Sequence, residues 1–180
     1  YTLIMSDKVD PKTFLPAARS MAMRKSVWKK IGGFPEKYSH NEDYVFSSML
    51  KRARVKIAFA KNAIAYWLPR SNLSGSFVMF FRFAYGDAEA QIIRSKVLLL
   101  FARYFLGIYV IFIAVFYQSS ILLFIIIFSF LFYLLWSILK NYKYVNQGVA
   151  FFYLPLLQIT SDIAVILGTS YGLLRRFVIK

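Results

Sequence analysis

The sequence of 180 residues contains no cysteine and a single histidine, His40. Without cysteine there is neither a disulfide framework nor a thiolate metal site, and one histidine leaves little scope for a zinc centre. The sequence also lacks a Gly-rich phosphate-binding loop. We therefore expect no metal site within this chain. The missing cysteines also fit a protein face on the reducing side of a membrane.

Acidic residues are scarce. The chain has 8 Asp and Glu against 23 Lys and Arg, which gives a net charge of +15. Such an excess suits anionic lipid headgroups, nucleic acid or phosphorylated substrates. Because the cations are scattered along the chain and no nucleic-acid-binding motif accompanies them, we expect no nucleic-acid partner.

Apolar residues are abundant, at 59% of the sequence with 19% aromatic, which is too much for an ordinary soluble domain. The composition changes sharply near Lys96, and almost every residue of the segment 97–139 is apolar or aromatic. This segment is long enough for two membrane passes of roughly 20 residues each. Polar residues at 117–120 mark the turn between them. We therefore expect an integral protein of the cell membrane with a transmembrane hairpin at 97–139.

Basic residues flank the predicted hairpin on both sides, with Lys96 before it and Lys140 after it. The positive-inside rule then places both flanks, and the part of the chain that precedes them, in the cytoplasm. A further apolar stretch at 148–174 ends in Arg175 and Arg176. If this stretch spanned the membrane, the two arginines would lie outside, against the same rule. A third transmembrane helix and a re-entrant or interfacial helix are therefore both open.

Residues 1–73 alternate short helical and strand periods, which is typical of a mixed α/β domain. Residues 74–96 place aromatic side chains on one helical face and predict an amphipathic interfacial helix that leads into the membrane. The expected strands are Ser20–Arg24, Arg54–Ala60 and Ala63–Leu68, and the expected helices are Lys25–Ile31, ended by Gly32 and Gly33, and Glu42–Ala53, with Asn41 at the N-cap.

Four short motifs follow one another between residues 16 and 93. In this order, they resemble the acceptor-side half of family 2 glycosyltransferases. The resemblance implies the C-terminal part of a GT-A (Rossmann-like) α/β domain, followed by the transmembrane hairpin and a further apolar helix. The motifs are Gly32-Gly33-Phe34-Pro35-Glu36, Asn41-Glu42-Asp43, Tyr66-Trp67-Leu68-Pro69-Arg70 and Phe83-Ala84-Tyr85-Gly86-Asp87.

The resemblance also implies an activity, the inverting transfer of a hexosyl group from a nucleotide sugar to a lipid-linked or membrane-adjacent glycan acceptor. Asp43, with Glu42 beside it, would be the catalytic carboxylate. Inversion by direct displacement needs a general base next to the acceptor hydroxyl. The spacing alone also fits a simpler interpretation, because acidic residues in the first turn of a helix complement the helix dipole.

Two arginines are candidates for binding substrate. Arg82 falls where processive members of the family carry Gln-x-x-Arg-Trp, but Met79 and Phe83 replace the Gln and the Trp. This departure argues against a cellulose- or chitin-like polymerase. Arg82 then either contacts the leaving diphosphate or serves as a cation for lipid headgroups. Arg70 either binds the same diphosphate through its planar guanidinium or lies on a surface turn.

Two further residues complete the predicted substrate site. Trp67 either stacks on a sugar ring or belongs to the core, as an aromatic residue that ends a strand commonly does. Gly33 either forms the sharp turn that lines the acceptor cleft or simply ends a helix.

The resemblance also implies a cofactor, a divalent Mg or Mn ion bound through an Asp-x-Asp motif in the first half of the domain. That motif is absent here, and the chain opens with Tyr1 instead of Met. We therefore interpret the chain as a fragment, inactive alone, whose metal and nucleotide sugar are bound by a missing N-terminal half.

Two other functions stay open. A non-enzymatic membrane adaptor would use its basic face to bind anionic lipids, at about 1 kcal/mol per Lys or Arg near the surface. A transporter or polymer-exporting fragment would line a conduit with its apolar helices, but the segment 97–139 has few polar positions to face such a conduit.

Overall fold

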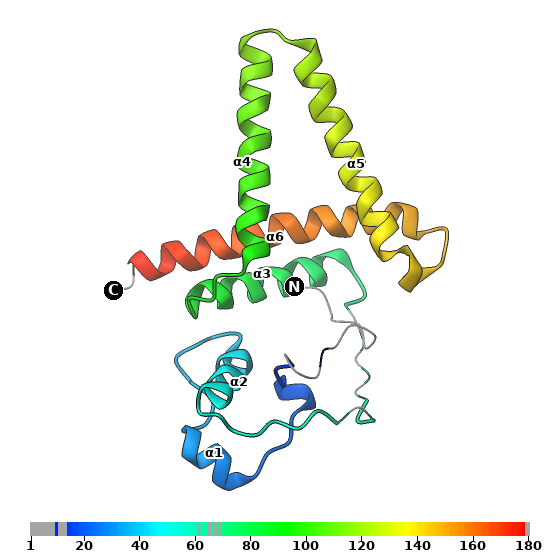
Figure 1. Cartoon of the computed structure of the whole chain (residues 1–180). Helices are drawn as coiled ribbons and strands as arrows, with labels where there is room; N and C mark the ends of the chain where they lie inside the picture. The colour runs from blue at the N-terminus through cyan, green and yellow to red at the C-terminus, as the bar shows by residue number, and fades with distance from the viewer. Residues whose placement is uncertain are drawn as a thin grey trace.

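The computed structural model describes residue 10 and residues 14–60, 62–64, 66, 68 and 70–178. Figure 1 shows a tall helical hairpin standing on a layer of two helices, with shorter helices beneath that layer. In chain order the described elements are the 3-10 helix η2 (Ala18–Ser20) and the α-helices α1 (Lys25–Ile31), α2 (Glu42–Arg52), α3 (Leu73–Glu89), α4 (Ser95–Phe116), α5 (Ser120–Val145) and α6 (Ala150–Val178).

The predicted α/β class is wrong, because the described residues form helices and loops but no strand. Two of the expected strands, Ser20–Arg24 and Arg54–Ala60, have no strand residues, and the described part of Ala63–Leu68 has none either. Alternating apolar and polar residues favour an extended chain, but a strand also needs a neighbour for its backbone N–H and C=O groups. None of these segments has such a neighbour among the described residues. A Rossmann-like GT-A domain is therefore not what this structure shows.

Both helices predicted before residue 73 are present. α1 begins and ends where the sequence places it, and Gly32 closes it in the left-handed region at φ 91°. α2 begins at Glu42, directly after Asn41. Asn41 stands at the N-cap position, but its φ is 60° and its side chain makes no capping hydrogen bond. That side chain instead bonds to α3, as described below.

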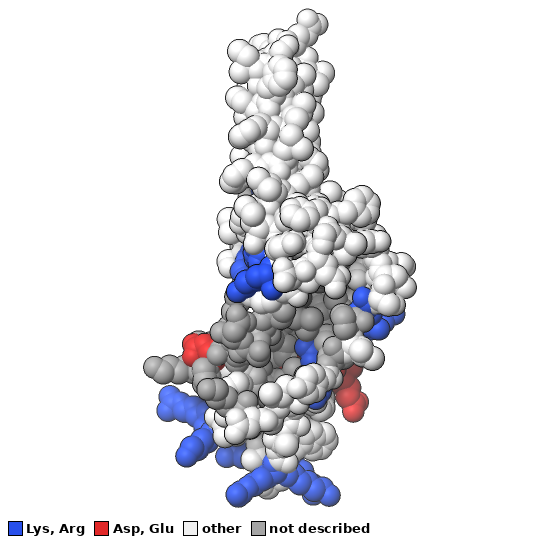
Figure 2. All heavy atoms as spheres, turned by 90° about the vertical axis from the view of Figure 1, so that its right-hand side faces the viewer, with Lys and Arg blue, Asp and Glu red and all other residues white. Residues whose placement is uncertain are grey.

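The predicted hairpin is also present, with α4 and α5 joined by a turn at residues 117–119. Most of their large apolar side chains lie on the surface of the molecule, among them Phe105, Phe112 and Phe128. Figure 2 shows the column formed by the hairpin without Lys, Arg, Asp or Glu on its visible face, except near its foot. Three described helices, α4, α5 and α6, are long and apolar enough to cross a membrane. This composition is that of a membrane protein.

α6 does not run alongside the other two apolar helices. It lies across the foot of the hairpin, parallel to α3 and packed against it (Figure 1). The contact is close because α6 carries glycines where the helices meet. A Cβ atom on Gly168 would lie 2.4 Å from the carbonyl oxygen of Phe81, and one on Gly172 would lie 2.8 Å from Cβ of Ala88. Small residues four positions apart allow two helix backbones to approach in this way.

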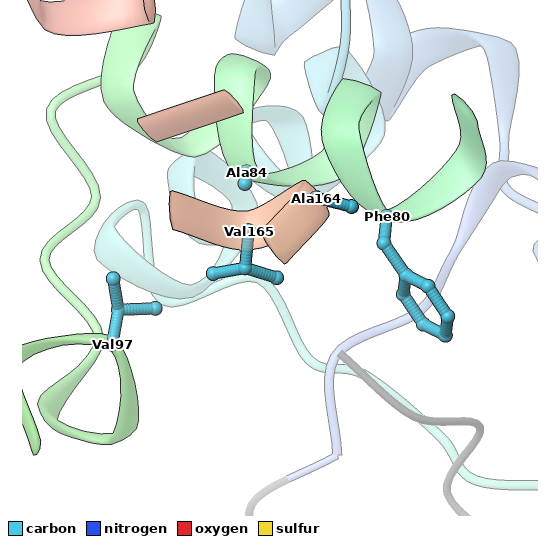
Figure 3. Packing of buried hydrophobic residues seen from close by; sticks show 5 residues of the cluster. All are labelled: Phe80, Ala84, Val97, Ala164 and Val165. Atoms are coloured by element: carbon cyan, nitrogen blue, oxygen red, sulfur yellow. The ribbon is translucent and has the colours of Figure 1, made fainter. Parts of the chain in front are cut away.

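The core is small and lies where α3, α4 and α6 meet. Figure 3 shows its five buried members, which are Phe80 and Ala84 on α3, Ala164 and Val165 on α6, and Val97 in the first turn of α4. All five are less than 9% exposed. This cluster fixes α3 and α6 to each other and ties the hairpin to both.

Candidate functional site

The loop before α2 is fastened to α3 by side-chain hydrogen bonds. The Asn41 amide donates to the carbonyl oxygen of Phe83 at 3.0 Å and to Oδ1 of Asp87 at 2.9 Å. At the last residue of α3, Oε2 of Glu89 accepts from both the backbone N–H and the hydroxyl of Ser39, at 2.8 Å each. These bonds place the first turn of α2, with its two acidic residues, beside the C-terminal half of α3.

Asp87 is the centre of this attachment. It is 2% exposed, and a buried carboxylate is tolerated only when it is paired. Nη2 of Arg94 lies 2.9 Å from its Oδ1, and Nε of Arg94 contacts its Oδ2. The same guanidinium lies 4.9 Å from the ring centroid of Tyr44 on α2. The ion pair thus joins α3 to the start of α4. The contact of the same guanidinium with Tyr44 adds α2 to this attachment.

The two predicted catalytic carboxylates have different surroundings. Asp43 accepts from the backbone N–H of Ala18 at 3.1 Å and from its neighbour Tyr44 at 2.7 Å. Glu42 is half-buried and makes no hydrogen bond or ion pair with any residue that the structure describes. A carboxylate has about four acceptor positions, so the two bonds orient Asp43 and leave it further capacity to accept a proton.

Arg82 lies on α3 and lines an open cavity of about 470 Å³. The cavity is bordered by α3, by the end of α6 and by the loop before α2. Its lining residues are Ser39, His40, Phe77, Val78, Phe81, Arg82, Tyr85, Tyr171 and Arg175. The guanidinium of Arg175 donates to the hydroxyl of Tyr85, whereas Arg82 makes no hydrogen bond or ion pair with a described residue.

His40 is one of the residues that line this cavity. Burial lowers the pKa of His40 below its ordinary value of 6.5, and the nearby guanidinium of Arg82 lowers it further, while the carboxylates of Glu89 and Glu42 act in the opposite direction. Its ring also contacts Tyr85 edge-on at 5.9 Å. The charges of Arg82 and Glu42 thus both act on the pKa of His40. These two predicted site residues therefore lie in one region.

The other predicted substrate residues lie apart from this region. Gly33 is buried at φ 76°, and a Cβ atom there would lie 2.6 Å from the ring of Trp28, so it turns the chain beneath α1. Arg70 is exposed just before α3 and does not line the cavity. Trp67 lies outside the described residues.

A second polar cluster lies where α4, α5 and α6 meet. Asp162, 5% exposed, accepts from Arg103 at 2.8 Å, Tyr133 at 2.6 Å and Tyr104 at 3.0 Å through Oδ2, and from Gln158 at 3.0 Å through Oδ1. All the hydrogen bonds of this carboxylate are internal. The cluster therefore holds three apolar helices together, and it does not present a free group to a ligand.

Sequence reasoning missed Arg175 as a residue that lines the same cavity as Arg82. Arg175 had been considered only as a topology signal, and nothing local shows that the end of α6 returns to α3. The signal that could have indicated it is the Gly168–Gly172 spacing, which favours close packing of α6 against another helix. The pairing of Asn41 with Asp87 was also missed, although both residues belong to the motifs singled out above.

The comparisons with known proteins add no relative. No family model matches the chain, and neither the curated proteins nor the solved structures contain a match. Together with the helical fold, this result overturns the resemblance to family 2 glycosyltransferases.

The described residues contain no group of three or more His, Cys, Asp or Glu side chains that could hold a metal ion. The carboxylates that act on the lining residue His40 are those of Glu89 and Glu42, and Glu89 already accepts the backbone N–H of Ser39. A divalent metal ion, if the protein uses one, needs ligands from outside this set.

Proposed function

We propose that this chain is the membrane-bound, acceptor-side part of an enzyme that transfers a sugar from a nucleotide sugar to a lipid-linked or membrane-adjacent glycan. The observation that carries the proposal is the attachment of the Glu42–Asp43 turn to α3, beside Arg82 and at the foot of an apolar hairpin. A reaction on a membrane-bound acceptor needs a carboxylate held at that level.

In this reaction Asp43 acts as the general base. The acceptor hydroxyl attacks the anomeric carbon, the bond to the nucleoside diphosphate breaks, and the proton of the hydroxyl passes to the carboxylate. The hydrogen bonds from Ala18 and Tyr44 fix the orientation of that carboxylate. A fixed orientation matters because effective proton transfer requires hydrogen-bond distance to the acceptor.

The nucleotide sugar, and a divalent Mg or Mn ion if one is required, would be bound by other protein segments. Arg82 and Glu42 both act on the pKa of His40. The charge of Arg82 is therefore near the site, where it could contact the leaving diphosphate or the phosphate of a lipid carrier.

The test is nucleotide release from candidate sugar donors by the full-length protein in membranes. We expect Asp43→Asn to lower turnover by about 10²-fold or more at matched expression, as removal of a general base does. Glu42→Gln is the matched neighbour. If Glu42→Gln abolishes turnover while Asp43→Asn does not, the base is Glu42. Near-normal turnover in both variants would reduce the pair to helix-end charges.

The second candidate function is the non-enzymatic adaptor. Asp43 favours it, since its two hydrogen bonds to backbone N–H groups also suffice for a purely structural role. The distribution of cations is less favourable. The lysines of α1 lie at the end of the molecule opposite the hairpin (Figures 1 and 2). At that place they are separated from lipid headgroups by α2 and α3, and charges farther than about 8–10 Å are largely screened. Absence of turnover with every donor would favour this function.

A further inference from the structure

The cavity between α3 and α6 combines two cations with an apolar wall. Arg82 projects from α3 and Arg175 from the last turns of α6, and both are exposed. Five apolar or aromatic side chains line the same space, namely Phe77, Val78, Phe81, Tyr85 and Tyr171. Its volume of about 470 Å³ lies within the usual range of ligand sites, about 300–1,000 Å³.

The described structure balances the charge of this cavity only in part. None of the described residues that line it is acidic. The Glu89 carboxylate acts on both His40 and Arg175, but its oxygens already accept from Ser39 and approach the hydroxyl of Tyr85. Two guanidiniums around one space repel each other unless an anion lies between them. Arginine side chains bind phosphate oxygens through paired N–H groups.

The location selects the kind of phosphate. α3 and α6 lie across the foot of the apolar hairpin (Figure 1). If α4 and α5 cross the membrane, as their length and composition allow, this foot lies at the level of the lipid headgroups. A lipid at this level presents its phosphate next to hydrocarbon, which matches a cavity with guanidiniums beside Phe77, Val78 and Phe81. A soluble phosphate has no apolar part to contact that wall.

We propose that this cavity binds the phosphate group of a membrane lipid, with Arg82 and Arg175 contacting the phosphate oxygens and the aromatic wall contacting the start of the hydrocarbon chain. The proposal rests on the proposed function only in one respect. If sugar transfer occurs, the bound lipid is the carrier of the acceptor glycan, and its phosphate anchors that acceptor while a glycan hydroxyl reaches Asp43.

The test uses the full chain in phosphatidylcholine nanodiscs that contain a fluorescent phosphatidic acid. We expect Arg82→Gln and Arg175→Gln each to weaken retention of the labelled lipid by about 10-fold, as loss of a charge-assisted hydrogen bond does. Arg176→Gln is the matched control, because Arg176 is exposed on the same turn but does not line the cavity. It should change retention by less than about 2-fold. Loading with phosphatidic acid should also raise the pKa of His40, since a bound anion offsets Arg82.

Two results would overturn the proposal. One is equal retention in the Arg82, Arg175 and Arg176 variants. The other is displacement of the labelled lipid by pyrophosphate at a concentration equal to that of unlabelled phosphatidic acid, which would assign the site to a soluble diphosphate. The outcome is independent of transfer. If lipid retention depends on Arg175 but the protein shows no turnover, the lipid site stands and the proposed function is wrong. If the protein shows turnover but lipid retention does not depend on Arg175, only the lipid site is wrong.

Discussion

At the scale of single residues, His40 reports on the charge around the candidate site. Its pKa is lowered first by burial and then by Arg82. Because the folded state binds the proton less well than the unfolded state, neutral His40 is the form compatible with the fold. Its contribution to stability is complete above the unfolded value of 6.5 and is lost as the pH falls below 6.5 towards the lowered pKa.

The first prediction is that Arg82→Gln raises the pKa of His40, since it removes one of the two causes that lower it. The measurement is an NMR titration of the imidazole in the full chain, where a single histidine gives a single signal. Arg70→Gln is the control, because Arg70 does not act on His40. An unchanged or lower pKa in Arg82→Gln would show that the two side chains do not interact.

At the scale of elements, the packing of α3 on α6 depends on glycine. A Cβ atom at Gly168 would lie 2.4 Å from the carbonyl oxygen of Phe81, which is backbone and cannot move aside, whereas nothing lies within 4 Å of a Cβ atom at Gly107 on α4. In a helix without such contacts, replacing glycine by alanine stabilises by up to about 1 kcal/mol.

The second prediction is therefore that two Gly→Ala substitutions change the free energy of unfolding in different ways. Gly168→Ala should destabilise the protein by about 1–3 kcal/mol, because overpacking outweighs the gain in helix propensity. Gly107→Ala should be neutral or stabilising. Thermal unfolding in detergent, followed by circular dichroism, measures both. If Gly168→Ala is as stable as Gly107→Ala, α6 does not pack closely against α3.

The third prediction concerns the Asp162 cluster. Asp162→Leu removes the shared acceptor of Arg103 and two tyrosine hydroxyls and leaves Arg103 only its bond to the Tyr133 hydroxyl. Arg103→Leu leaves the carboxylate without its cation. Each change should cost about 1–3 kcal/mol, less than for a fully buried pair because Arg103 is 44% exposed. The double variant should cost clearly less than the sum of the two single variants. Additive costs in the same unfolding assay would show that the pair is not coupled.

The elements that were predicted correctly are those that local sequence determines. α1 ends at Gly32 because that residue adopts a left-handed conformation, and the hairpin follows from the composition of 97–139 alone. The strands were predicted wrongly because pairing depends on a distant partner that alternation does not reveal. The position of α6, and the presence of Arg175 and Arg82 in one cavity, depend on packing between helices far apart in sequence. Asn41 was placed correctly but given the wrong role, since its amide bonds to α3.

At the scale of the whole molecule, the orientation of α6 changes the expected topology. α6 lies across the foot of the hairpin instead of beside it (Figure 1). If α4 and α5 cross the membrane, α6 then lies along its surface, and both ends of α6 are on the same side. Arg175 and Arg176 would share that side with Lys140, which agrees with the positive-inside rule.

The fourth prediction tests this topology with single cysteines at Gln118, Asn146 and Arg176, in a chain that has no cysteine of its own. Gln118 lies in the turn of the hairpin, and the other two lie near opposite ends of α6. In intact cells a membrane-impermeant maleimide should label position 118 and spare 146 and 176, which become labelled after permeabilisation. Labelling of 176 but not 146 in intact cells would mean that α6 spans the membrane.

The layer of α3 and α6 also affects the lipid around it. With this topology α4 and α5 cross both leaflets. On one side only, α3 and α6 also lie flat in the headgroup region. Its cross-section is then larger on one side of the bilayer, like a wedge. Helices inserted along one surface respond to membrane curvature, so this protein should accumulate where that leaflet is expanded and leave regions where it is compressed.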